Sequence, residues 1–403
     1  MASSKPTQQA SASMLIGAAL LMATSAIGPG FLTQTATFTE QYKASLSCIM
    51  ILAILMALVV QLNVWRILIA SGKSANIVGN EVLPGLGYVI SALVFVGGIA
   101  FEIGNVAGAG MGLNVLFGVN VKLGAAISAV VCIAIFVVKQ FGKAMDRFST
   151  ILGGVMIVLA AYAAVTSHAP VGQVLYRTVA PETFSFLALT TLLGGTVGGY
   201  ITFSGAHRLL DGGVKGPGAV HQATRTATMG IVVTAVVRYL LFFAVLGVVL
   251  LGIKLDPTNP AATPFQHVAG TFGYKLFGLV LWSAAATSVV GCAYTSFSFV
   301  KSYFKTVQNH YATWIMAFIV FCTAWFIILG RPVTLLVLAG SINGLILPFS
   351  LGSVLLASRN KKIVGQEYHH PTWLIVLGVI VVAIALYSGI RSLGSIASLW
   401  KGS

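Results

Sequence analysis

Apolar stretches long enough to cross a lipid bilayer recur along the whole sequence. A helical crossing takes about 20 residues, because an α-helix rises about 1.5 Å per residue and the hydrocarbon core is about 30 Å thick. Of the 403 residues, 57% are hydrophobic and 8% are charged, a composition that excludes an ordinary soluble fold. We therefore expect an all-α membrane protein with about eleven transmembrane helices, near residues 13–37, 45–69, 86–117, 121–138, 149–166, 184–206, 228–252, 271–299, 312–329, 333–357 and 372–392.

The basic residues are distributed unequally between the two ends of these helices. A net charge of +15 by itself would also fit a nucleic-acid partner. With a cytoplasmic N-terminus, however, fourteen of the 23 lysines and arginines fall in cytoplasmic segments and eight in external ones, while Arg238 falls within a span. Positive charge concentrates on the cytoplasmic side of membrane proteins. We expect a multi-pass protein of the plasma (inner) membrane with an external C-terminus and no nucleic-acid partner.

The chain is expected to form a cytoplasmic tail at 1–12 and a single transmembrane domain at 13–403, because no proline- or serine-rich linker divides it. The first and sixth apolar runs are each interrupted, by IGPGF at 27–31 and by GGTVGG at 194–199. Backbone groups freed by such breaks need polar surroundings, which lipid does not provide.

Breaks that correspond in two five-helix halves are typical of secondary transporters with inverted repeats. The repeats would be about 13–166 and about 184–357, with an extra helix at about 372–392. The alternative is that both glycine clusters serve only helix packing, since glycine is common in membrane helices. We expect the protein to act as a monomer.

Several segments resemble one known family. IGPGFLTQTATFTEQYKASLSCIMILAILMALVVQ (27–61) is similar to the first two helices of NRAMP-type metal transporters. AFEIGNVAGAGMGLNVLFGV (100–119) resembles the third helix of that family, 140–157 the start of its fifth, and LILPFSLGSVLLASRNKKIVG (345–365) its tenth helix with the basic loop that follows. The resemblance implies the leucine-transporter fold, with ten helices in inverted repeat plus an eleventh.

The chain departs from that family at its metal-binding positions. Where the family has Asp-Pro-Gly-Asn, this sequence has Gly28, Pro29, Gly30 and Phe31, and the Met-Pro-His of the sixth helix falls on Gly198-Gly199-Tyr200. Divalent cations need carboxylate, carbonyl, imidazole or sulfur ligands in place of their water shell. We therefore expect no metal site and no cofactor, and a neutral pocket lined by backbone N–H groups, hydroxyls and aromatic rings.

Such a pocket favours an anionic solute, since the N-terminal ends of half-helices carry free N–H groups and a positive dipole. Besides backbone groups at the two breaks, polar side chains on the half-helices are candidates for orienting it. The alternative for each hydroxyl is a bond back to its own helix. The candidate substrate-binding residues are Gly28, Pro29, Gly30, Phe31, Gln34, Thr35, Gly198, Gly199, Tyr200 and Thr202.

Two sets of residues are candidates for coupling transport to Na+ or H+. Glu102 is an acidic residue deep in an apolar run, which is costly and therefore suggests a function; it falls where NRAMP proteins have a helix 3 Asp, whereas Asn105 replaces the neighbouring acidic position of their proton route. Glu102 either titrates during transport or pairs with Arg238 or a polar neighbour. In sodium-coupled members of the fold, an Ala-x-x-Thr-Ser spacing like that of Ala284, Thr287 and Ser288 binds Na+; a helix contact explains these hydroxyls nearly as well.

The sequence thus predicts an ion-coupled secondary transporter of a small carboxylate-bearing solute, such as an amino acid or a cyclic derivative. The resemblance makes pyroglutamate a specific candidate. The main alternative is transport of manganese or magnesium through a rearranged site, and another is a signalling protein on a transporter scaffold. Enzyme motifs such as HExxH are absent. We also expect Cys48, Cys132, Cys292 and Cys322 to be inert apolar residues, and His369-His370 to lie on the surface.

Overall fold

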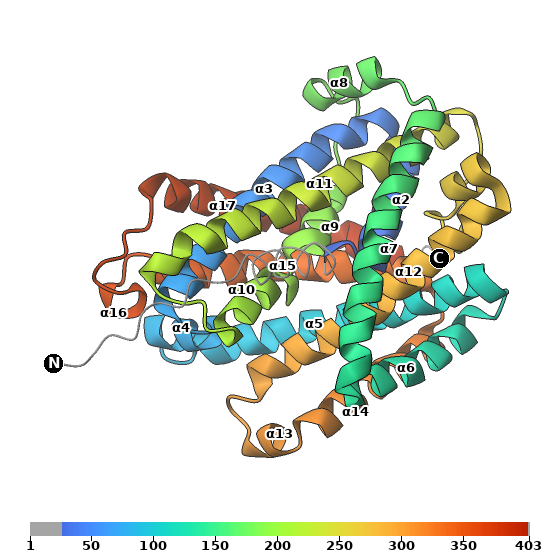
Figure 1. Ribbon diagram of the computed structural model, residues 1–403. Helices are drawn as coiled ribbons and strands as arrows, with labels where there is room; N and C mark the ends of the chain where they lie inside the picture. The colour runs from blue at the N-terminus through green and yellow to red at the C-terminus, as the bar shows by residue number, and fades with distance from the viewer. Residues whose placement is uncertain (1–25, 402–403) are drawn as a thin grey trace.

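The computed structural model describes residues 26–401, without the side chains of 139–146, 149, 400 and 401, and this part of the chain is helical with no strand (Figure 1). By length and composition it contains eight helical segments able to cross a membrane, or nine if the bent pair Thr150–Thr166 and Val171–Val179 counts as one span. The all-α membrane fold is therefore confirmed, while the number of eleven spans stays a prediction.

Within the described residues, the predicted apolar runs fall on helices of the structure. The helices are α2 (Pro29–Tyr42), α3 (Leu46–Ser71), α4 (Ala75–Val82), α5 (Leu86–Phe117), α6 (Val121–Val137), α7 (Lys139–Thr166), α8 (Val171–Val179), α9 (Phe186–Val197), α10 (Ile201–Asp211), α11 (Val220–Leu250), α12 (Thr263–Val300), α13 (Lys305–Asn309), α14 (Tyr311–Leu329), α15 (Pro332–Ala357), α16 (Lys361–Val364) and α17 (Thr372–Lys401), with short 3₁₀ turns at Lys43–Ser45 and Pro217–Ala219. The short helices α4, α8, α13 and α16 lie at the periphery of the bundle (Figure 1).

The largest differences from the predicted boundaries are at helix ends. Helix α7 begins at Lys139 instead of near 149, α11 begins at Val220 instead of near 228, and α17 continues to Lys401 instead of ending near 392. The added turns mix apolar residues with polar ones or glycine, as in VHQATRTA at 220–227 and LGSIASLWK at 393–401, and a continuous run of high hydropathy does not extend over them. Most of the first run, 13–25, lies outside the described residues.

Both predicted breaks are present. Helix α9 ends at Val197 and α10 begins at Ile201, so Gly198, Gly199 and Tyr200 separate two half-helices. Ala26 is helical, Ile27 and Gly28 are not, and α2 begins at Pro29. Because proline lacks an N–H group and its φ angle suits a first helical position, it fits the start of a helix well.

Small residues bring the helices around the breaks close together. A Cβ atom on Gly194 of α9 would lie 2.0 Å from the carbonyl oxygen of Gly340 on α15, and one on Gly108 of α5 would lie 2.1 Å from Cβ of Pro29. Close backbone approach of this kind is how membrane helices associate when lipid removes the hydrophobic drive. The breaks are thus enclosed by α5, α9, α11 and α15.

The four cysteines are free, and Cys132, Cys292 and Cys322 are buried in the bundle while Cys48 is half-buried. They pack as small apolar residues, as expected.

Candidate binding site at the helix breaks

The break between α9 and α10 depends on glycine and on a partner from α15. Gly199 has φ +53°, a left-handed conformation in which glycine is favoured, and a Cβ there would lie 1.8 Å from Oδ1 of Asn343. The Asn343 amide nitrogen donates to the carbonyl oxygens of Gly97 (3.0 Å) and Ala339 (2.8 Å), while its Oδ1 has no hydrogen-bond partner. Asn343 therefore ties α15 to α5 beside the break.

Sequence reasoning did not select Asn343. A single amide inside the apolar run 333–357 was the available signal, because a buried polar group in a membrane helix needs a partner.

Gln34 lies one turn into α2 and is fully buried. Its Nε2 donates to the carbonyl oxygen of Leu336 on α15 (2.8 Å), which leaves Oε1 without a partner. A Cβ on Gly195 would lie 2.3 Å from that oxygen, and one on Gly340 would lie 2.4 Å from Nε2. The amide is thus confined between α2, α9 and α15.

Arg238 of α11 brings a positive charge to the same place. Its guanidinium carbon lies 4.0 Å from the ring centroid of Phe31, and Nη1 donates to Oγ1 of Thr196 (2.8 Å) and to the carbonyl oxygen of Leu192 (3.3 Å). Nε and Nη2 have no partner, and the side chain is 1% exposed. The break is therefore not neutral, contrary to the expectation from the sequence, which located Arg238 within a span but not its direction.

Two of the candidate hydroxyls bond nearby carbonyl oxygens, that of Thr35 within α2 and that of Thr202 across the break to the end of α9. Thr35 Oγ1 donates to the carbonyl oxygen of Phe31 (2.7 Å), and Thr202 Oγ1 donates to that of Val197. Such bonds satisfy the hydroxyl locally. The ring of Tyr200, buried at the start of α10, packs edge-on against Phe101 at 5.5 Å.

Glu102 lies on the α5 side of the break, fully buried, and neither carboxyl oxygen has a hydrogen-bond partner. Its neighbours include Cys292, whose thiol donates to the carbonyl oxygen of Gly98 (3.4 Å), and Tyr200. Asn105, one turn further along α5, is also buried, with an unpaired Nδ2.

The ion pairs among the described residues are Lys73–Glu81 and Arg177–Glu182. The predicted pairing of Glu102 with Arg238 is therefore wrong, whereas its pairing with a polar neighbour and its titration during transport stay predictions. The two side chains approach the breaks from different helices.

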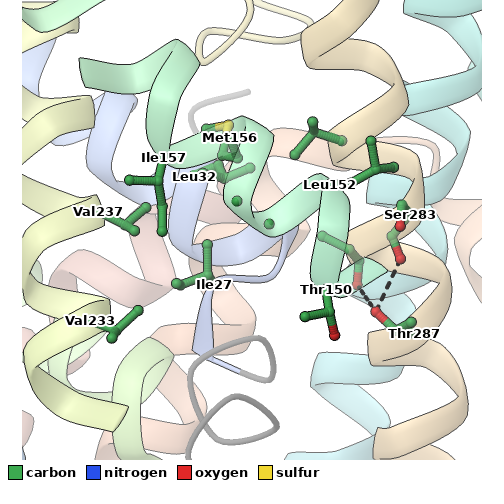
Figure 2. Close-up of a pocket in the computed structure, with 14 residues that line it drawn as sticks. Ile27, Leu32, Thr150, Leu152, Met156, Ile157, Val233, Val237, Ser283 and Thr287 are labelled. Atoms are coloured by element: carbon green, nitrogen blue, oxygen red, sulfur yellow. Dashed lines mark hydrogen bonds between the residues drawn. The ribbon is translucent and has the colours of Figure 1, made fainter. Parts of the chain in front are cut away.

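A cavity of about 170 Å³ adjoins the first break, between α2, α7, α11 and α12 (Figure 2). Ile27 from the break lines it together with Ala284 and Thr287 of α12. The Thr287 hydroxyl is hydrogen-bonded to the carbonyl oxygens of Ser283 and Ala284, at 3.0 Å each. Ser288 is buried, does not line the cavity, and its hydroxyl has no partner. The two predicted sodium ligands Ala284 and Thr287 thus share one cavity with the first break.

No group of three or more His, Cys, Asp or Glu side chains suited to a metal ion occurs in the described part of the chain.

Two histidines pack into the bundle near helix ends. The ring of His207 in α10 stacks on Phe203 and Phe299, and its Nε2 accepts from the backbone N–H of Ala75 (3.4 Å). His370 was expected on the surface with His369, and that expectation is wrong: it is buried, whereas His369 is exposed. The approach of α17 to α3 covers His370, and the sequence does not reveal which of two adjacent histidines is covered.

A helical membrane bundle with two broken helices is the architecture of secondary transporters with the leucine-transporter fold. The chain belongs to the Nramp family, since the model for natural resistance-associated macrophage protein-like sequences matches residues 19–395. It is 53% identical over 390 residues to the uncharacterized membrane protein YcsG of Bacillus subtilis (strain 168), covering 96% of each chain.

Two solved structures have the same fold. One is a mutant of the Eremococcus coleocola manganese transporter, at TM-score 0.78 and 16% identity, covering 100% of this chain and 90% of that one. The other is Mhp1, a nucleobase-cation-symport-1 family transporter with bromovinylhydantoin bound, at TM-score 0.62 and 14% identity, covering 98% and 96%.

Proposed function

We propose that this Nramp-family transporter carries a small organic anion bearing a carboxylate, and that the solute binds where the breaks before α2 and between α9 and α10 meet. The binding residues would be those that the sequence singles out at the two breaks, together with Arg238. Alternating access between the two repeats would then move the solute across the membrane.

The observation that carries this proposal is the buried guanidinium of Arg238. A cation without a carboxylate partner is costly within a membrane protein, and its contact with the Phe31 ring compensates only in part. An anion in the break would supply the missing charge. Helix α2 adds its own positive end there, because residues at a helix N-terminus leave N–H groups free.

The position of Phe31 also argues for an organic solute. The family's metal site has an asparagine there, whereas the Phe31 ring contacts Arg238 and fills the space next to it. Mhp1, which shares the fold, holds an organic ring compound. Pyroglutamate, with one ring and one carboxylate, is a suitable first probe.

The coupling ion would be Na+ at Ala284, Thr287 and Ser288 or H+ at Glu102. The unpaired Ser288 hydroxyl supports the first and the unpaired Glu102 carboxyl the second. We also propose that the protein acts as a monomer in the plasma membrane, with its N-terminus in the cytoplasm and no resident cofactor. Its helices would form two repeats followed by one extra helix.

A divalent cation is the second candidate. The Eremococcus coleocola protein is a manganese transporter, and the unpaired amide oxygens of Gln34 and Asn343 are hard ligands of the type that magnesium and manganese accept. Against it, Arg238 would repel a cation in the same break.

The test is uptake into proteoliposomes that contain the purified protein. We expect L-pyroglutamate or another small amino or carboxylic acid to accumulate in the presence of a sodium or proton gradient, and manganese not to compete. Manganese uptake with no carboxylate uptake would contradict the proposal and support the second candidate. Empty liposomes provide the control for passive entry.

A further inference from the structure

Two buried side chains at the breaks each have hydrogen-bonding groups without partners, and these groups are of opposite kinds. Gln34 has a free acceptor, Oε1, and Arg238 has two free donors, Nε and Nη2. Both side chains are within 1% of complete burial. Polar groups left unpaired in a membrane protein are costly, and a ligand that satisfies them recovers that cost.

The hydrogen bond of Gln34 Nε2 fixes the orientation of the amide, and the atom left without a partner is therefore the acceptor Oε1. Since Nε2 donates to the carbonyl oxygen of Leu336, the amide orientation that leaves Oε1 free is the one that makes this bond. The close approach of Gly195 and Gly340 prevents the amide from moving toward α9 or α15. Gly30, whose Cβ would lie 3.4 Å from Nε2, closes a third side.

The Arg238 donors have a geometry that suits a carboxylate. Thr196, Leu192 and the Phe31 ring hold the guanidinium through Nη1 and one face. Nε and Nη2 lie along the free edge, where two parallel N–H groups match the two oxygens of a carboxylate.

The acceptor and the donors lie against the same two helices, α2 and α9. Phe31 and Gln34 are three residues apart on α2 and so share one face of it, with Cβ atoms about 5–6 Å apart. On the facing helix α9, Gly195 contacts the amide and the adjacent Thr196 contacts the guanidinium. A small molecule could therefore contact both.

We propose that the solute carries an N–H donor next to its carboxylate, with the carboxylate bound by Arg238 and the N–H group by Oε1 of Gln34. The class that satisfies both is the α-amino acids and their cyclic N–H analogues. This inference rests on the proposed function, and it adds a second recognition point that distinguishes amino acids from plain carboxylates.

The wild-type protein tests this with a ligand series of constant shape. Proline has both groups, cyclopentanecarboxylate lacks the N–H group, and prolinamide lacks the carboxylate; pyroglutamate, alanine and propionate extend the series. Ligands that bind the native state raise the melting temperature. We expect each analogue that lacks one group to bind about 10- to 100-fold more weakly than its parent, since a buried partner is left unpaired.

Variants then assign each group to its residue. Gln34→Met keeps the length of the side chain and should abolish the preference for proline over cyclopentanecarboxylate. Arg238→Gln should abolish the preference for proline over prolinamide, and Arg238→Lys should restore part of it. Gln222→Met, elsewhere on α11, and Arg66→Gln, which removes a guanidinium bonded to Thr224 on α11, are the matched controls and should keep both preferences.

The outcomes separate this inference from the proposed function. Equal binding of proline and cyclopentanecarboxylate by the wild type overturns the inference but leaves a carboxylate transporter. Discrimination that persists in Gln34→Met overturns the inference in the same way. If manganese binds and neither carboxylates nor carboxamides do, both proposals are wrong. Should a variant fail to fold, the wild-type ligand series decides by itself.

Discussion

Two buried polar regions of the molecule differ in how many of their polar atoms have hydrogen-bond partners. One is the pair of helix breaks; the other, called the joint below, consists of Asn63 of α3 with Tyr368 and His370, which precede α17. At the joint, His370 Nε2 lies 2.9 Å from Oδ1 of Asn63, and the Tyr368 hydroxyl lies 2.7 Å from His370 Nδ1. Asn63 Nδ2 donates to the carbonyl oxygens of Val59 (2.8 Å) and Leu374 (3.1 Å). Since Asn63 Oδ1 can only accept, His370 carries its proton on Nε2 and accepts from Tyr368 on Nδ1.

At the breaks, by contrast, Gln34, Arg238, Glu102 and Asn343 each keep at least one unpaired polar atom. A fully satisfied buried network stabilises one arrangement, whereas a partly satisfied one is costly. We infer that the joint fixes α17 to the bundle, whereas the unpaired groups at the breaks are free to bind a ligand or to change partners when the conformation changes.

The largest effect is expected from Gly28→Asp at the start of α2. It restores the family's acidic residue and places negative charge beside the proposed anion. At about 4 Å, like charges repel by about 4 kcal/mol at an effective dielectric of 20, or roughly a thousandfold in affinity. Pairing of the new carboxylate with Arg238 would have the same consequence. We expect uptake of organic anions to vanish while the protein remains folded.

Gly218→Asp, an exposed position with open space around it, makes the same charge change outside the bundle and should leave uptake intact. If Gly28→Asp takes up carboxylates at near wild-type rates, the solute binds elsewhere or carries no negative charge. The unpaired groups at the breaks would then not be a binding site for an anion.

The sequence predicted the regular elements and the place of both breaks, because apolar length and helix-breaking residues are local properties. Gln34 and the break glycines could be selected as candidates in the same local way, as a polar residue and helix-breaking residues next to an interrupted apolar run. The direction of Arg238 toward Phe31, the position of Asn343 beside Gly199 and the burial of His370 depend on which helices pack together. Hydropathy does not encode these contacts, since Arg238 on α11 meets α2 and α9 across long separations in the chain.

A smaller effect is expected at the joint, from His370→Leu. The change leaves Asn63 Oδ1 and the Tyr368 hydroxyl without their partner, which costs about 1–3 kcal/mol for each buried group left unsatisfied. The melting temperature should fall, and amides of α17 should exchange faster with solvent. Ligand preference should not change. His369→Leu replaces the exposed neighbour and should alter neither quantity; equal destabilisation by both variants would show that the network does not hold α17.

A still smaller effect is expected from Ser288→Ala, near the cavity. Because the Ser288 hydroxyl makes no hydrogen bond in this structure, its removal should leave the fold unaffected. If it binds Na+, the sodium concentration for half-maximal uptake should rise about tenfold, the effect of about 1.4 kcal/mol. Ser298→Ala, whose hydroxyl bonds its own helix, is the control. Uptake that ignores sodium but collapses with a proton uncoupler would assign coupling to Glu102 instead.

The last effect concerns pH and again the joint. Burial, and secondarily the positive charge of Arg66, lower the pKa of His370 from its ordinary 6.5 to about 4. Above pH 6.5 the ring is neutral in both folded and unfolded protein, so its contribution is constant. Between pH 6.5 and 4 the unfolded chain binds a proton that the folded network excludes. The free energy of unfolding therefore decreases as the pH is lowered through this range, and it levels off below pH 4.

The effect should amount to a few degrees of melting temperature, measured with ligand absent. It should be missing in His370→Leu and retained in His369→Leu, because the buried ring is the group that causes it. A wild-type melting temperature that rises on acidification through this range would mean that the protonated ring is accommodated, with Asn63 and Tyr368 rearranged around it. The hydrogen bonds of the joint would then be able to change partners, as we infer for the breaks.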